Sequence, residues 1–185
     1  MKNRHFVIIS GFIFLAAISR LLPHPPNFTA VGAIALFGAA YFASKKWAIL
    51  IPLLALWLSD LVLNNLIYAE FYAGMTFLSW NMLWVYGSIL LIVFAGFKLL
   101  KKVTLPRVLT GAFGAALIFF IVSNFGVWLT SPMYPMSLEG LIACYTAAIP
   151  FFHYTLAGNL VYCTALFGAY EFLKLKTPQL VGAEA

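Results

Sequence analysis

The chain has 185 residues, of which 64% are hydrophobic and only 9% are charged. A soluble domain of this length does not need so much apolar surface, so the composition excludes a water-soluble globular protein. The formal net charge of +6 would suggest a nucleic-acid partner in a soluble protein. Here the basic residues flank apolar runs, so lipid headgroups explain them and no nucleic-acid partner is expected.

Six apolar runs follow one another along the chain, and a helix that spans a bilayer needs about 20 such residues. We therefore predict an all-α integral membrane protein with six transmembrane helices. The runs cover residues 6–22, 29–43, 47–67, 78–100, 108–129 and 138–173. The second run is short and rich in small residues, which allow neighbouring helices to approach closely. In the last run we expect a short interfacial helix over 138–148 that Pro150 separates from the crossing helix.

Six helices with short loops occupy residues 1–176, which predicts a single transmembrane domain and a short cytoplasmic tail over 177–185. Ten of the eleven Lys and Arg residues lie where this topology places cytoplasmic loops and ends. These are Lys2, Arg4, Lys45, Lys46, Lys98, Lys101, Lys102, Arg107, Lys174 and Lys176. Because basic segments are retained in the cytoplasm, we expect both termini on that side. The exception is Arg20, at the outer end of the first run.

Polar side chains within the runs gather near their outer ends. Asp60 is the chain's only aspartate and the only acid within the first five runs. An unpaired carboxylate costs about 3 kcal/mol at the centre of a membrane helix, so we expect Asp60 to be paired, protonated or solvated. Arg20 matches it in depth and has the opposite charge. An Asp60–Arg20 pair could be structural, could contact a ligand, or could do both.

The shared depth of the polar residues predicts a pocket that opens outward, because a continuous pore would need polar residues along its full length. The proline-rich stretch Leu22–Phe28 would serve as its lid. The predicted ligand-binding residues are Arg20, His24, Asn27, Asp60, Asn64, Trp80, Asn81, Asn124, Trp128 and Asn159. Tyr134 would add stacking surface. Taken singly, the asparagines could instead join helices, and the tryptophans could mark the membrane interface.

No motif for catalysis or metal binding is present in the sequence. It contains no HExxH, GxSxG or phosphate-binding loop, so we expect no enzymatic activity and exclude ATP hydrolysis by this chain. His24 and His153 lack the spacing of metal ligands, so neither a metal nor another cofactor is expected. Cys144 and Cys163 form no CxxC pair and are interpreted as packing residues.

Three stretches resemble the substrate-binding (S) component of energy-coupling-factor vitamin transporters. They are Leu21–Phe28 with the small-residue run that follows it, Trp57–Leu61, and Ala157–Tyr162. The resemblance implies an S-component-like six-helix bundle, a small vitamin-like solute and an energy-coupling ATPase module as partner. The chain departs from these proteins in having no Ala-x-x-x-Ala contact on the first run. It also has Lys2 where the cobalt and nickel members have a histidine.

The sequence is more similar still to an uncharacterised group of small bacterial membrane proteins. The shared features are the proline-rich opening, the Ser123–Trp128 run and the Gly158-Asn159 step. We therefore expect a multi-pass protein of the bacterial inner membrane that binds a small solute for uptake and needs a partner for energy coupling. One alternative is a structural or assembly subunit without ligand. The other is a small enzyme acting on lipid headgroups through Asp60 and a histidine.

Overall fold

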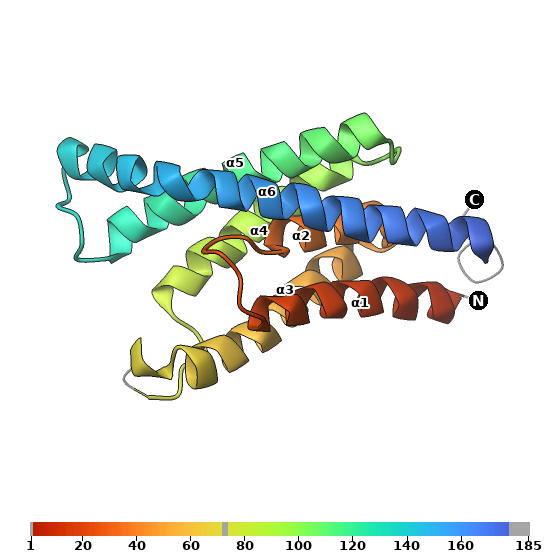
Figure 1. The fold of residues 1–185 in the computed structure, drawn as a ribbon, viewed down its shortest axis with the longest axis horizontal. Coiled ribbons are helices and arrows are strands. Elements are labelled where there is room, and N and C mark those ends of the chain that lie inside the picture. The colour runs from red at the N-terminus through yellow and green to blue at the C-terminus, as the bar shows by residue number, and fades with distance from the viewer. Residues whose placement is uncertain (1, 72–73, 178–185) are drawn as a thin grey trace.

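The computed structural model describes residues 2–71 and 74–177, and all regular secondary structure in these ranges is helical. The α-helices are α1 (Lys2–Ile18), α2 (Val31–Tyr41), α3 (Lys45–Val62), α4 (Trp80–Leu99), α5 (Leu105–Thr130) and α6 (Leu138–Lys176), as Figure 1 shows. Short 3₁₀ turns cover Ser19–Leu21 and Ala69–Phe71, and a π-helical turn covers Leu63–Ile67. The prediction of an all-helical fold is confirmed. Apart from Thr177, the predicted tail lies outside the described residues.

Five of these helices are long and apolar enough to cross a membrane. The exception is α2, whose 11 residues span only about 16 Å of a hydrocarbon core of about 30 Å. The predicted second transmembrane helix over 29–43 is therefore a short helix. Its first eight residues, Val31–Gly38, are all buried. The proline-rich stretch and the turn after it are not helical, which is why α2 begins late.

The short helix α2 lies at the centre of the bundle and contacts each of the other five α-helices. Small residues make this possible, since a methyl group added at Gly96 of α4 would come within 2.7 Å of Ala39. A methyl group added at Gly111 of α5 would come within 3.4 Å of Leu36. Small residues at helix contacts are the usual means of close packing in membranes, where the hydrophobic effect does not drive helices together.

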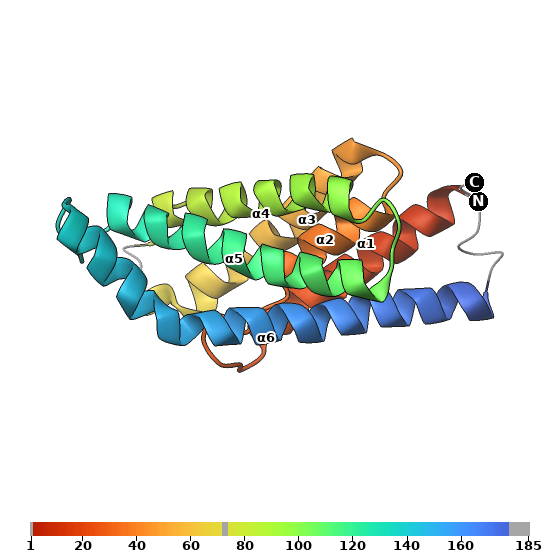
Figure 2. The same ribbon diagram turned by 90° about the horizontal axis from the view of Figure 1, so that it is seen from above.

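The last helix does not break at Pro150, contrary to the prediction of two separate segments. α6 is continuous over 39 residues and contains Pro150. Proline removes one backbone hydrogen bond and crowds the preceding turn, which bends a helix without necessarily ending it. Figure 2 shows the N-terminal part of α6 inclined to the rest. At about 1.5 Å per residue, α6 is about 58 Å long and exceeds the hydrocarbon thickness.

α1 begins and α6 ends at the same end of the bundle, which we call the terminal end (Figure 1). Polar contacts join the helices there. The Tyr41 hydroxyl donates to Glu171 Oε1 at 2.6 Å, and His5 Nδ1 lies 3.0 Å from the Tyr170 hydroxyl. Lys45 Nζ lies 5.8 Å from the centre of the Phe97 ring. The start of α3 and the end of α4 therefore also meet at the terminal end. α5 ends and α6 begins at the opposite end.

The stretch between η1 (Ser19–Leu21) and α2 rests against α6. Asn27 has a φ of 63°, a left-handed conformation that reverses the chain before Thr29. Gly158 of α6 allows the close approach, because an added Cβ there would lie 2.9 Å from the Thr29 nitrogen. The Phe28 and Tyr162 rings pack beside this contact, with centroids 6.1 Å apart. One glycine therefore determines how closely this loop lies on α6.

Gly158→Ala should lower thermal stability in detergent by about 1–3 kcal/mol, because the new methyl group would collide with backbone rather than with a movable side chain. Gly168→Ala, in the same helix, is the matched control, since no atom lies within 4 Å of a Cβ added there. It should leave stability unchanged or raise it by up to about 1 kcal/mol. Equal effects of the two substitutions on thermal unfolding would contradict the described position of the loop.

Candidate functional site

A cleft of about 360 Å³ lies between α4, α5, α6 and the loop before α2, toward the opposite end of the bundle. It is lined by Asn27, Val85, Phe119, Phe120, Ser123, Asn124, Val127, Met133, Tyr134, Cys144, Ala147, Ala148, Phe151, Phe152 and Thr155. The described lining residues include no charged side chain. Aromatic rings form much of the wall, and the Phe120 and Phe152 rings meet edge to face with centroids 5.3 Å apart.

Three of the polar lining residues already bond to backbone carbonyls, two of them within their own helix. Ser123 Oγ donates to Phe119 O at 2.6 Å, and Thr155 Oγ1 donates to Phe151 O at 3.3 Å. The Cys144 thiol donates across to the Asn124 carbonyl at 3.4 Å. Such hydroxyl-to-carbonyl bonds are the default for Ser and Thr inside apolar helices. These groups therefore contribute little directional polarity to the cleft.

Three other lining residues keep polar atoms without a protein partner. The Asn124 amide donates from Nδ2 to Phe120 O at 2.7 Å, which leaves Oδ1 with no hydrogen bond among the described residues. The Tyr134 hydroxyl and the Asn27 side-chain amide make no hydrogen bond to any described residue. Asn27 is exposed and Asn124 and Tyr134 are half-buried, so water or a ligand can serve these three groups. They are the directional hydrogen-bonding groups of the cleft.

A narrow recess of about 10 Å³ shares the walls Phe119 and Thr155 with the cleft and ends at Asn159. A volume of this size is at the lower limit for one water molecule. Asn159 is 2% exposed and donates from Nδ2 to Ala112 O at 3.3 Å. Its amide also lies so close to Gly32 that a Cβ there would be 2.5 Å from Oδ1. Asn159 therefore joins α6 to α2 and α5 and does not line the cleft.

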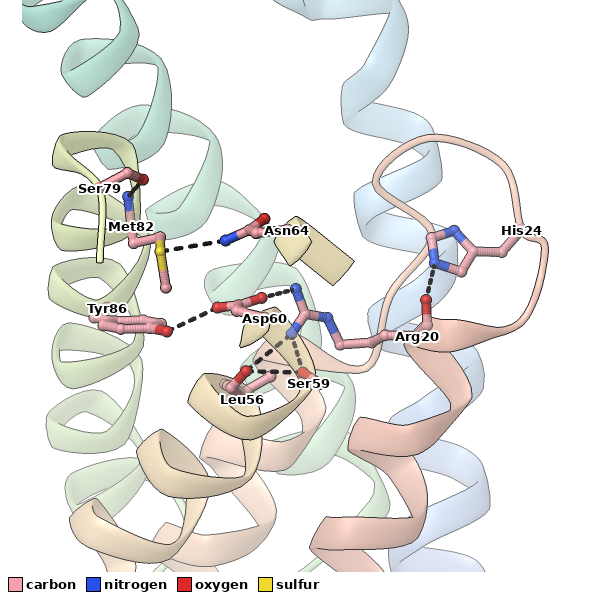
Figure 3. A network of polar contacts seen from close by, with 9 residues as sticks. All are labelled: Arg20, His24, Leu56, Ser59, Asp60, Asn64, Ser79, Met82 and Tyr86. Atoms are coloured by element: carbon pink, nitrogen blue, oxygen red, sulfur yellow. Dashed lines mark hydrogen bonds and ion pairs between the residues drawn. The ribbon is translucent and has the colours of Figure 1, made fainter. Parts of the chain in front are cut away.

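Arg20 and Asp60 form the predicted ion pair, with Nη2 of Arg20 2.7 Å from Oδ1 of Asp60 (Figure 3). The second carboxylate oxygen accepts a bond of 2.8 Å from the Tyr86 hydroxyl. Nη1 of Arg20 donates to Ser59 Oγ and, at 3.4 Å, to Leu56 O. The charged side chains are only 13% and 10% exposed. Both charges are thus neutralised inside the bundle, and the pair connects the end of α1 to α3 and α4.

The remaining predicted residues do not line the cleft. Asn64 Nδ2 contacts the Met82 sulfur at 3.5 Å, and Trp128 Nε1 donates to Pro135 O at 3.1 Å. Asn81 Oδ1 accepts a bond of 3.3 Å from the Thr130 hydroxyl. The ring nitrogens of His24 lie beside backbone carbonyls, with Nδ1 2.9 Å from Pro25 O and Nε2 3.2 Å from Arg20 O. The Trp80 side chain is 74% exposed.

The structure therefore does not bring the ten predicted residues into one pocket. Asn27 and Asn124 line the cleft, whereas the Arg20–Asp60 pair and Asn159 lie in contacts of their own. The residues share a depth along the helices but face different neighbours around each helix axis. Depth follows from the sequence, whereas the direction of a side chain around the axis follows from packing.

Sequence reasoning missed most of the wall of the cleft. The aromatic doublets Phe119-Phe120 and Phe151-Phe152 supply four of its lining residues. Adjacent aromatic residues at similar depth in consecutive helices were the available signal, but they are hard to distinguish from lipid-facing residues. Tyr134, which was expected to provide stacking surface, does line the cleft.

The comparison with known protein families matches residues 1–180. The chain belongs to DUF6580, a family of unknown function. No curated protein and no solved structure matches the chain. The resemblance to energy-coupling-factor S components has no support from these comparisons and stays a prediction.

Removing one partner of the Arg20–Asp60 pair should destabilise the protein by about 3–5 kcal/mol, because the other charge would be left buried and unpaired. The double variant Arg20→Met with Asp60→Leu should cost less than the sum of the two single changes. Thermal unfolding of the four proteins in the same detergent measures this coupling. Additive effects, or two harmless single changes, would contradict the pair.

Proposed function

We propose that this protein is a membrane-embedded binding subunit for a small solute, which occupies the cleft between α4, α5 and α6. The proposal is supported above all by the three unpaired polar groups of Asn27, Asn124 and Tyr134 in an otherwise apolar wall. A volume of about 360 Å³ suits a small-molecule site, since such sites typically measure about 300–1,000 Å³. Mostly apolar walls with a few convergent polar groups are also typical of these sites.

We propose further that the cleft opens toward the outside of a bacterial inner membrane and that both termini are cytoplasmic. The basic residues support this orientation, because Lys45, Lys46, Lys98, Lys101 and Lys102 lie in the connections at the terminal end or in the helix turns beside them. The cleft lies toward the opposite end. Uptake of the solute would need a separate energy-coupling partner, because the sequence contains no phosphate-binding loop.

In this proposal the Arg20–Asp60 pair supports the site without contacting the solute. Arg20 lies in η1, immediately before the loop that carries Asn27 to the wall of the cleft. The ion pair holds the start of that loop on α3, and Gly158 holds its end on α6. The two contacts determine where Asn27 lies.

The second candidate function is that of a structural or assembly subunit. It is favoured by the bonds of Asn64, Asn81 and Asn159 to other helices, which are typical of contacts that join helices. A lipid-headgroup enzyme has less support, because both oxygens of the Asp60 carboxylate already accept hydrogen bonds. Retention of a ligand distinguishes the first two functions.

Native mass spectrometry of the purified protein should detect a bound small molecule, and Asn124→Leu combined with Tyr134→Phe should abolish its retention. Asn81→Leu, outside the cleft, is the matched control and should retain it. The Asn124 change should alter stability by less than about 1 kcal/mol. Asn159→Leu should instead cost about 1–3 kcal/mol, because it removes a packed, bonded amide. Equal retention in all variants, or none in the wild type, would favour the structural subunit.

A reporter that is active only in the cytoplasm should be active when fused after Lys176 and inactive when inserted beside Glu70. The expectation follows from the basic residues at the terminal end. A second reporter, active only outside, should give the reverse result. If the fusion after Lys176 reports from the outside, the proposed orientation of the cleft is wrong.

A further inference from the structure

The cleft also restricts the chemistry of its solute. We infer that it takes an uncharged aromatic solute that carries at least one N–H or O–H donor, such as a neutral amide or hydroxyl group. The inference rests on the proposed function, because it concerns the same cleft. It adds the charge, shape and polarity of the molecule that binds there.

The charge follows from the walls. No Asp, Glu, Lys, Arg or His lines the cleft among the described residues. The nearby charges of Arg20 and Asp60 are engaged with each other at 2.7 Å and belong to a separate contact. A carboxylate or phosphate is normally recognised by Arg or Lys, and a buried ligand charge without a counter-charge is unfavourable. A charged solute would lose its hydration on entering this cleft and would find no opposite charge there.

The shape follows from the rings that line the cleft. Phe119 and Phe120 come from α5, Phe151 and Phe152 come from α6, and Tyr134 comes from the connection between these helices. The Phe120 ring already packs edge to face against Phe152, with an interplanar angle of 70°. Aromatic rings prefer offset and edge-to-face contacts with other rings. A flat aromatic solute can extend this ring cluster, whereas a flexible acyl chain would leave the polar groups of the cleft unpaired.

The donor follows from the orientation of the Asn124 amide. Its nitrogen is held by the Phe120 carbonyl at 2.7 Å, which can only accept a hydrogen bond. The bond to Phe120 fixes the orientation of the amide, and its oxygen makes no hydrogen bond to a described residue. That oxygen can only accept, so it is matched by a donor on the ligand. Tyr134 can donate or accept, and so can the side chain of Asn27. A site that presents a fixed acceptor favours a ligand with a donor over an analogue that lacks one.

The experiment uses a cysteine at Ala147, an exposed residue that lines the cleft. Ala143→Cys is the matched control, because Ala143 is exposed on the same helix but does not line the cleft. The native Cys144 and Cys163 are buried, and the wild type gives their background rate. Alkylation by N-ethylmaleimide is followed by mass spectrometry on protein in nanodiscs. Four probes share one ring system: 2-naphthamide, 2-naphthoate, 2-naphthylmethylammonium and 2-methylnaphthalene.

We expect 2-naphthamide to protect Ala147→Cys at concentrations about tenfold lower than the two charged probes, and to leave Ala143→Cys unprotected. Adding Asn124→Leu should reduce protection by 2-naphthamide to the level of 2-methylnaphthalene. The ratio between probes in the same nanodiscs, compared with the control cysteine, separates binding in the cleft from partitioning into lipid.

Equal or better protection by 2-naphthoate or the ammonium probe would overturn the inferred charge while leaving the cleft as a binding site. Protection by 2-methylnaphthalene equal to that by 2-naphthamide would overturn the inferred donor. No protection by any probe would overturn both this inference and the proposed function. The same holds if Ala147→Cys reacts no faster than the wild type, because the cleft would then be closed or filled by an acyl chain.

Discussion

The packing of five helices around the short helix α2 is the constraint on which the rest of the structure depends. Small residues on α2 and its neighbours allow this arrangement, as the contacts of Gly96 with Ala39 and of Gly111 with Leu36 show. Because α2 has only 11 residues, it fills the centre of the bundle over about half of a hydrocarbon core. The first residues of α2, Val31 and Gly32, line the recess that adjoins the cleft. The space for a ligand therefore lies beyond the beginning of α2.

The loop before α2 and the Arg20–Asp60 pair follow from the same constraint. Because α2 begins only at Val31, the residues between η1 and α2 have to be placed beside the end of α1. The proline-rich stretch fills this place in a non-helical conformation. Irregular backbone at membrane depth is tolerated where it is covered by protein or lines a cavity. Here it lies on α6 at Gly158 and reaches the cleft at Asn27. The ion pair keeps the preceding turn on α3, and Tyr86 extends the contact to α4.

Two kinds of polar group coexist in this protein, and they have different consequences. Asn159 and Asn64 bond to neighbouring helices, and Trp128 bonds to the connection after its own helix, so these residues contribute to cohesion. Asn124 and Tyr134 keep an atom free beside aromatic rings, which contributes to recognition. Residues of the same type thus serve both purposes, and the difference lies in their partners. Both proposals about function depend on this distinction.

The sequence by itself determined the helical class, most helix ends and the opposite charges that pair at Arg20 and Asp60. Hydrophobic length and charge along the chain are one-dimensional properties, and they decide these features directly. Only the tertiary structure decided that α2 is short and central, that α6 continues through Pro150, and that Asn124 lines a cleft while Asn159 does not. These features depend on which neighbour meets each side of a helix. In a chain that is apolar on nearly every helix face, no hydrophobic periodicity distinguishes the side facing lipid from the side facing a cavity.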